Sequence, residues 1–111
     1  MDVLRMTRRR HGDLTVVSLA GEVDVDNSGR MRTCLDESAR ARGCRLVVDL
    51  SAVTFIDTTG LGVLVRVRAD LREREGSIAL VAPGGQVLRR LRRTNLAPLF
   101  PIYATLSQAL A

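Results

Sequence analysis

Residues 46–65, which run LVVDLSAVTFIDTTGLGVLV, decide the fold. The segment 46–50 begins with a β-branched apolar run and is typical of a strand buried on both faces. The connection 51–57 carries three more apolar side chains that we expect to pack against the core, at Val53, Phe55 and Ile56. After Asp57 the apolar residues take helical spacing, and an Asp or Thr directly before such a run marks a helix start. The stretch therefore predicts a buried strand, a compact connection and a helix that begins at Thr58.

Two glycines fall unusually early in this helix, at Gly60 and Gly62. Each costs about 1 kcal/mol relative to alanine inside a helix. One interpretation is a tight turn that packs closely against the sheet. The other is an open approach that lets a partner reach Thr58 or Thr59. The spacing alone leaves both open.

Residues 48–64, VDLSAVTFIDTTGLGVL, resemble the signature of the STAS-domain anti-sigma factor antagonists. That signature has a strand followed by Asp-Ser-Ser-Gly-Leu-Gly. The segment Gly21-Glu22-Val23-Asp24 is similar to a second marker of the family, Gly-Glu-Leu-Asp, near the end of an early strand. The resemblance covers essentially the whole chain in length and in element order.

The resemblance implies a phosphorylation switch at Thr58, which stands where the family has its first, phosphorylated serine. The unphosphorylated form is expected to bind an anti-sigma factor serine/threonine kinase and so release a sigma factor. Phosphorylation at Thr58 would switch binding off, and a phosphatase would reverse it. Threonine keeps the hydroxyl that accepts the phosphate, although its methyl group restricts χ1.

By the same resemblance, the partner-binding residues are Asp24, Asp57, Thr58, Thr59, Gly60 and Gly62. Chemistry alone leaves other roles open: Asp24 caps the next helix or contacts the partner, and Asp57 caps its helix or orients the acceptor. Thr58 itself could serve as a plain helix cap, and Thr59 could support the turn. At a helix start a phosphate is expected to be tolerated, because free amides and the helix dipole favour an anion.

Composition predicts one small domain, residues 1–111, of 12.1 kDa. The net charge is +5, and all 17 basic residues are arginines. Over 66–75 the arginines are interleaved with acidic residues, which is typical of a solvated helix face. Aromatic residues make up only 3% of the chain, so bases would find few stacking platforms. No apolar run approaches the ~20 residues of a membrane span, and the amino terminus lacks an apolar signal region. We expect a cytoplasmic protein that contacts neither nucleic acid nor membrane directly.

The residues also argue against catalysis and metal binding. Cys34 and Cys44 have no second pair to complete a zinc site, and the single His11 stands in a turn-like His-Gly-Asp. A hydrolase would need a nucleophile with an oriented base, which this chain does not supply. We expect no catalytic residue, no metal and no cofactor, since the ATP would belong to the partner kinase.

The expected fold is α/β: a small single-domain STAS fold with a mixed four- to five-stranded sheet. An antiparallel hairpin opens the chain, later strands are mainly parallel because helices separate them, and helices pack mainly on one face. The expected strands are 4–10, 14–20, 46–50, 77–81 and 102–103, and the expected helices are 27–42, 58–75, 86–94 and 105–111.

Two other functions fit parts of the sequence. The first is a STAS scaffold subunit of a signalling or lipid-transport complex that is never phosphorylated, which threonine in place of serine keeps open. The second is a small basic nucleic-acid binder, whose affinity would fall steeply with salt.

Overall fold

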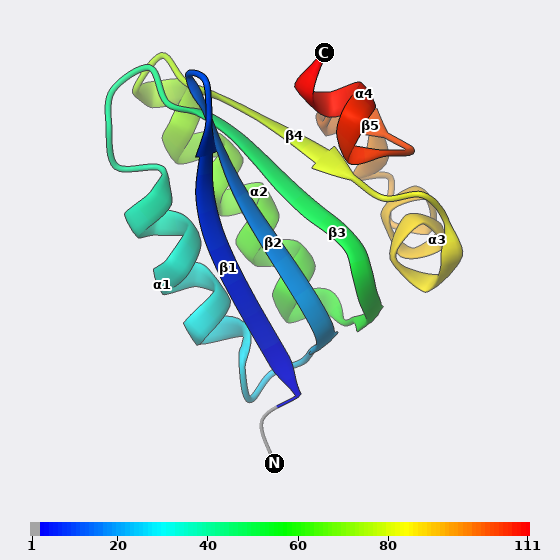
Figure 1. The fold of residues 1–111 in the computed structure, drawn as a ribbon. Helices are drawn as coiled ribbons and strands as arrows, with labels where there is room; N and C mark the ends of the chain where they lie inside the picture. The colour runs from blue at the N-terminus through cyan, green and yellow to red at the C-terminus, as the bar shows by residue number, and fades with distance from the viewer. Residues whose placement is uncertain (1–2) are drawn as a thin grey trace.

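Five strands form one mixed sheet in the order β1-β2-β3-β4-β5 (Figure 1). The computed structural model describes residues 3–111. The strands are β1 (Leu4–His11), β2 (Leu14–Val23), β3 (Arg45–Ile56), β4 (Ser77–Val81) and β5 (Ile102–Tyr103). The helices are α1 (Ser28–Ser38), α2 (Thr58–Glu73), α3 (Gly85–Arg93) and α4 (Leu106–Leu110), with a 3-10 turn at Ala97–Leu99. Only β1 and β2 are antiparallel and the other pairs are parallel, which confirms the predicted fold class.

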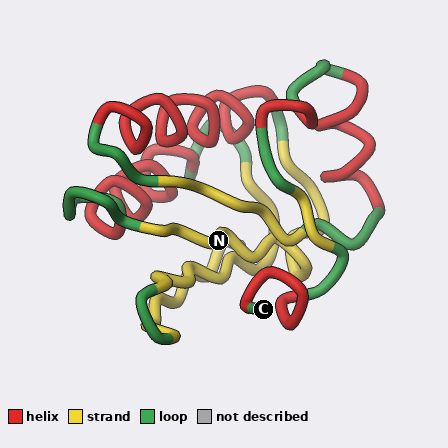
Figure 2. The backbone as a smooth tube through the Cα atoms, turned by 90° about the horizontal axis from the view of Figure 1, so that it is seen from above, coloured by secondary structure: helices red, strands yellow, loops and turns green. Residues whose placement is uncertain are grey.

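Helices lie on both faces of the sheet but mostly on one, as predicted. Inner residues of α1, α2 and α3 join one face of the sheet in the larger core cluster, which includes Leu35, Leu64 and Leu91. The short α4 crosses the opposite face, where Leu106 and Leu110 pack on a smaller cluster around Val16 and Val47. Figure 2 shows this division, with the carboxyl-terminal helix alone on its side of the sheet.

Strands β2 and β3 are longer than the sequence predicts. The segment 51–56, expected as a connection, continues β3 alongside the end of β2 with two register shifts. Gly21, expected to break the second strand, instead lies inside it with φ +110°. A Cβ at Gly21 would lie 1.7 Å from the carbonyl oxygen of Val3, so only glycine fits this close approach. Both strands therefore reach the edge where α2 begins.

Two helices end earlier than predicted. Helix α1 stops at Ser38 rather than at residue 42, and α2 stops at Glu73 rather than at residue 75. The left-handed residue after α2 is Glu75, with φ +60°, and not Gly76. Glycine is required at 76 for a different reason: a Cβ there would lie 2.5 Å from the carbonyl oxygen of Cys44.

Candidate functional site

The predicted site residues gather where two parallel strands end side by side. Val23 at the end of β2 pairs with Ile56 at the end of β3, and the amide of Asp57 donates to the carbonyl of Val23 over 3.1 Å. Asp24 and Asp57 are therefore the first residues beyond the same edge of the sheet. Helix α2 starts at this edge, so the β2–α1 corner and the first turn of α2 lie close together (Figure 1).

Asp57 is the N-cap of α2. Its Oδ1 accepts hydrogen bonds from the amides of Thr59, at 3.0 Å, and Gly60, at 3.3 Å, and from the hydroxyl of Thr59. Burial acts to raise the pKa of this carboxyl group, but the hydrogen bonds and the positive charge of Arg90 outweigh burial and hold the pKa below 3.8. The carboxylate is ionised at neutral pH and takes two of the amides that we expected to remain free for an anion.

Thr58 is the first residue of α2, and its side chain is exposed. Within residues 3–111, neither a hydrogen bond nor an ion pair involves its hydroxyl. Thr59 is also exposed, but its hydroxyl donates to Asp57 and supports the cap. Of the two neighbouring threonines, Thr58 therefore presents the free hydroxyl and Thr59 has a structural bond.

Asp24 organises the loop between β2 and α1 rather than capping the helix. Its Oδ1 accepts from the amides of Asp26, at 2.9 Å, and Asn27, at 3.3 Å, while its own amide donates to Oδ1 of Asn27 over 2.9 Å. The N-cap of α1 is Asn27, which makes no side-chain cap bond and donates instead to the carbonyl of Glu22. The corner is thus held rigid beside α2.

The two early glycines of α2 serve the two different purposes considered for them. Gly60 is buried, and a Cβ there would lie 2.6 Å from Cγ1 of Val23 and 2.7 Å from Cγ1 of Ile56. It is therefore required for close packing of the helix on the strand ends. Gly62 is exposed, and a Cβ there would meet nothing within 4 Å, so it leaves the helix surface open.

Two exposed apolar side chains flank this edge, and neither was predicted. Val25 in the β2–α1 corner is 69% exposed. Phe55, expected in the core, is 39% exposed, while its neighbours Val53 and Ile56 are buried. The outward orientation of Phe55 depends on the register shifts of β3, which the sequence alone does not show.

Helix α3 is tied to the same edge by Gln86. Its side-chain Oε1 accepts from the amide of Ile56 and its Nε2 donates to the carbonyl of Ile56, both over 2.9 Å. One turn later on the same face of α3 lies Arg90, which is half-buried. The only sequence pattern that would have indicated an inward position for Gln86 and Arg90 is their spacing of four residues among the apolar positions of the helix.

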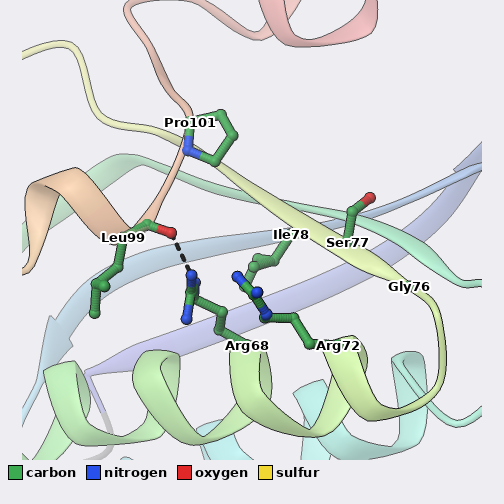
Figure 3. Close-up of a pocket in the computed structure, with 7 residues that line it drawn as sticks. All are labelled: Arg68, Arg72, Gly76, Ser77, Ile78, Leu99 and Pro101. Carbon is green, nitrogen blue, oxygen red and sulfur yellow. Dashed lines mark hydrogen bonds between the residues drawn. The ribbon is translucent and has the colours of Figure 1, made fainter.

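A cavity of about 310 Å³ lies at the other end of α2, between that helix, the start of β4 and the segment before β5 (Figure 3). Nε of Arg68 donates to the carbonyl of Leu99 over 2.7 Å, which ties α2 to that segment. Arg72 lies in the last turn, where a cation offsets the negative end of the helix dipole. Because α2 has 16 residues, its ends are about 24 Å apart, and this cavity is separate from the Thr58 edge.

Other residues considered from the sequence lie away from this edge. His11 pairs with Leu14 at the hairpin end of β1 and β2, opposite to the end that carries Asp24. Cys34 and Cys44 are free thiols. Within residues 3–111 there is no cluster of three or more acidic, cysteine or histidine side chains that could hold a metal ion. Across the same residues, every helix is too short or too polar to cross a membrane.

Comparison with protein families gives one match that spans nearly the whole chain. The family model described as STAS domain matches residues 5–109. Among proteins of known role, the anti-sigma F factor antagonist of Paenibacillus polymyxa is 30% identical over 101 residues, which are 90% of this chain and 86% of that protein.

Solved structures agree with this match. The structure of an anti-sigma factor antagonist from Mycobacterium paratuberculosis superposes with a TM-score of 0.87 at 31% identity, and covers 96% of this chain and 91% of that one. The Bacillus cell fate determinant SpoIIAA in its phosphorylated form has a TM-score of 0.72 at 18% identity, covering 96% of both chains, which shows a shared fold alone.

Proposed function

Because this chain belongs to the STAS domain family, we propose that it is an anti-sigma factor antagonist switched by phosphorylation at Thr58. The unphosphorylated protein binds an anti-sigma factor kinase and thereby releases a sigma factor. The phosphorylated protein no longer binds, and the kinase recaptures its sigma factor. A phosphatase resets the cycle. All of this takes place in the cytoplasm.

One observation carries the proposal: Thr58 is exposed at the start of α2, and its hydroxyl makes no hydrogen bond within residues 3–111. The neighbouring Thr59 hydroxyl is occupied by the Asp57 cap, so a kinase would find only one uncommitted acceptor in the motif. The cap and the packing of Gly60 fix the first turn of α2, so the acceptor is presented on a rigid element.

The chemistry needs a partner that supplies both the phosphate and the base. Oγ1 of Thr58 attacks the γ-phosphorus of ATP, an O–P bond forms, and the bond to the bridging oxygen breaks to release ADP. The hydroxyl proton passes to a base on the kinase. This chain contributes the acceptor and its orientation, so we assign it no catalytic residue and no cofactor.

Phosphorylation would weaken binding through charge and desolvation. The modification adds about −1.5 to −2 charges at neutral pH. The surface that would receive the kinase holds the exposed side chains of Val25 and Phe55 beside the carboxylates of Asp24 and Asp57. A phosphate would have to lose its water to be buried against such apolar groups, which is costly unless the partner supplies a counter-charge.

The test is site mapping by mass spectrometry after incubation with ATP and candidate kinases from the same genome. We expect one phosphate, at Thr58, that is lost in Thr58→Ala and kept in the matched variant Thr59→Ala. Affinity of the kinase for the two forms should differ by at least tenfold. Tight kinase binding without modification at Thr58 would instead support a scaffold subunit that is never phosphorylated, and equal affinity for both forms would refute the switch.

A further inference from the structure

Arg90 is a half-buried arginine of α3 with no committed partner. Its Nε atom is buried and has no hydrogen-bond partner within the described residues 3–111. Buried donors are nearly always paired, so an unpaired guanidinium nitrogen requires an explanation. The two hydrogen bonds between Gln86 and Ile56, one donated by each residue, hold this face of α3 against the residue before Asp57. Arg90 follows on that same face, because residues four apart in a helix are neighbours.

The start of α2 has few free amides left to hold a phosphate on Thr58. An anion at a helix start is normally held by the free amides of the first turn. Here the Asp57 carboxylate already accepts from the amides of Thr59 and Gly60. A phosphoryl group on Thr58 would therefore find two of the three amides of Thr58–Gly60 taken and would gain from a donor outside α2, while its nearest charged neighbour in sequence is the negative Asp57.

The charges around this edge are mostly negative. The β2–α1 corner contributes Glu22, Asp24 and Asp26. Arg90 is the cation that acts on Asp57, since its charge is one of the causes that lower the pKa of that carboxyl group. The two side chains form no ion pair, so Asp57 does not occupy the guanidinium group of Arg90.

We propose that Arg90 is the intramolecular receptor for the phosphoryl group on Thr58. This inference rests on the proposed phosphorylation and adds α3 to the switch. The guanidinium group offers several donors in a planar fork that matches phosphate oxygens, and its unpaired Nε shows that the described residues do not already saturate that fork. In the unphosphorylated protein the guanidinium group of Arg90 acts on the carboxylate of Asp57 by charge alone. After modification it pairs with the phosphate and offsets the repulsion from Asp57.

The experiment installs phosphothreonine at position 58 during synthesis with an expanded genetic code, so no kinase is needed. Phosphorus NMR then measures the second pKa of the phosphate, which is about 6 without neighbours. In the wild type we expect a value below 6. In Arg90→Gln it should rise by about one unit, because a nearby opposite charge lowers the pKa of an acid by that order. The matched control is Arg92→Gln, which removes the same charge from an exposed position about 200° around α3.

A second measurement covers the case in which Arg90→Gln does not fold. In the wild type, the Nε–Hε resonance of Arg90 should shift strongly on phosphorylation while that of Arg92 stays in place. An equal phosphate pKa in wild type and Arg90→Gln, or an unmoved Arg90 resonance, would overturn the inference. Because the phosphate is installed directly, failure of every kinase to modify Thr58 refutes the proposed function without altering this result.

Discussion

Replacing Gly60 by alanine should weaken the fold, whereas the same change at Gly62 should not. The Cβ of Gly60→Ala would lie 2.6 Å from Cγ1 of Val23, and 2.7 Å and 3.0 Å from Cγ1 and Cδ1 of Ile56. Both neighbours are fully buried, at 0% exposure. They belong to a close-packed core and cannot move away without a cost in packing energy, so the start of α2 or the ends of β2 and β3 must shift. At Gly62 the new methyl group meets nothing within 4 Å.

The size of the effect follows from two opposing terms. Overpacking a core costs about 1–3 kcal/mol. Alanine in place of glycine in a helix returns up to about 1 kcal/mol, and both variants gain this term. The difference in unfolding free energy between the two variants therefore isolates the clash, at about 1–3 kcal/mol. For a chain of 111 residues the unfolding entropy is about 0.23 kcal/mol/K, so Gly60→Ala should melt about 4–13 °C below Gly62→Ala.

Thermal and urea unfolding of the purified variants measure this difference directly. Gly62→Ala should melt at or above the wild-type temperature, and it serves as the control for any general effect of adding a methyl group to α2. If the two variants melted together, the close packing of α2 on Val23 and Ile56 would not be a source of stability and the reasoning would be wrong.

Four further variants, at three positions, test the cap at Asp57, the hydrogen bonds between Gln86 and Ile56, and the acceptor Thr58. Asp57→Ala should lose about 0.5–2 kcal/mol of stability through the missing cap. Because the folded-state pKa of Asp57 lies below 3.8, the stability that its carboxylate contributes is complete above the unfolded-state pKa and is lost as pH falls through the folded-state pKa. Melting curves from about pH 5 to about pH 2 should therefore show a smaller loss of stability in Asp57→Asn than in the wild type. Gln86→Leu leaves the amide and carbonyl of Ile56 unpaired and should lower the free energy of urea unfolding by about 1–3 kcal/mol. A loss near zero would mean that water takes over the two hydrogen bonds of the Gln86 side chain. Thr58→Ala should stay within about 0.5 kcal/mol of wild type by the same assay, because the side chain is exposed and unbonded, and a larger loss would assign Thr58 a structural role.

The strand and helix order could be read from the sequence because local patterns and tertiary packing agree there. The apolar run of β3 is buried on both faces, and Asp57 caps α2 where a cap residue precedes helical spacing. The local sequence is therefore enough to predict the buried strand and the helix that follows it at the centre of the sheet. The same holds for Thr105, which caps α4 by accepting from the amide of Gln108.

The end of β3 could not be read in this way. Its buried residues Leu50, Val53 and Ile56 are three apart, which matches neither the alternation of a regular strand nor a full helical face. The cause is pairing: β3 carries extra residues opposite β2 at two register shifts, so alternation restarts after each one. Since the shifts depend on both strands, no window of one strand reveals them, and Phe55 was placed in the core although it is exposed.

The candidate site shows the same limit, because its residues take their roles from neighbours that are distant in sequence. Motif and spacing identify Asp57 and Thr58, but the state of the α2 amides depends on which groups already occupy them. Once Asp57 takes the amides of Thr59 and Gly60, the helix start has little left to offer an anion. A phosphate on Thr58 would then draw on α3, which is held there by Gln86. A capped helix start is therefore a reason to look for the receptor of a phosphate on the next packed element, since a cap and a phosphate cannot both use the same amides.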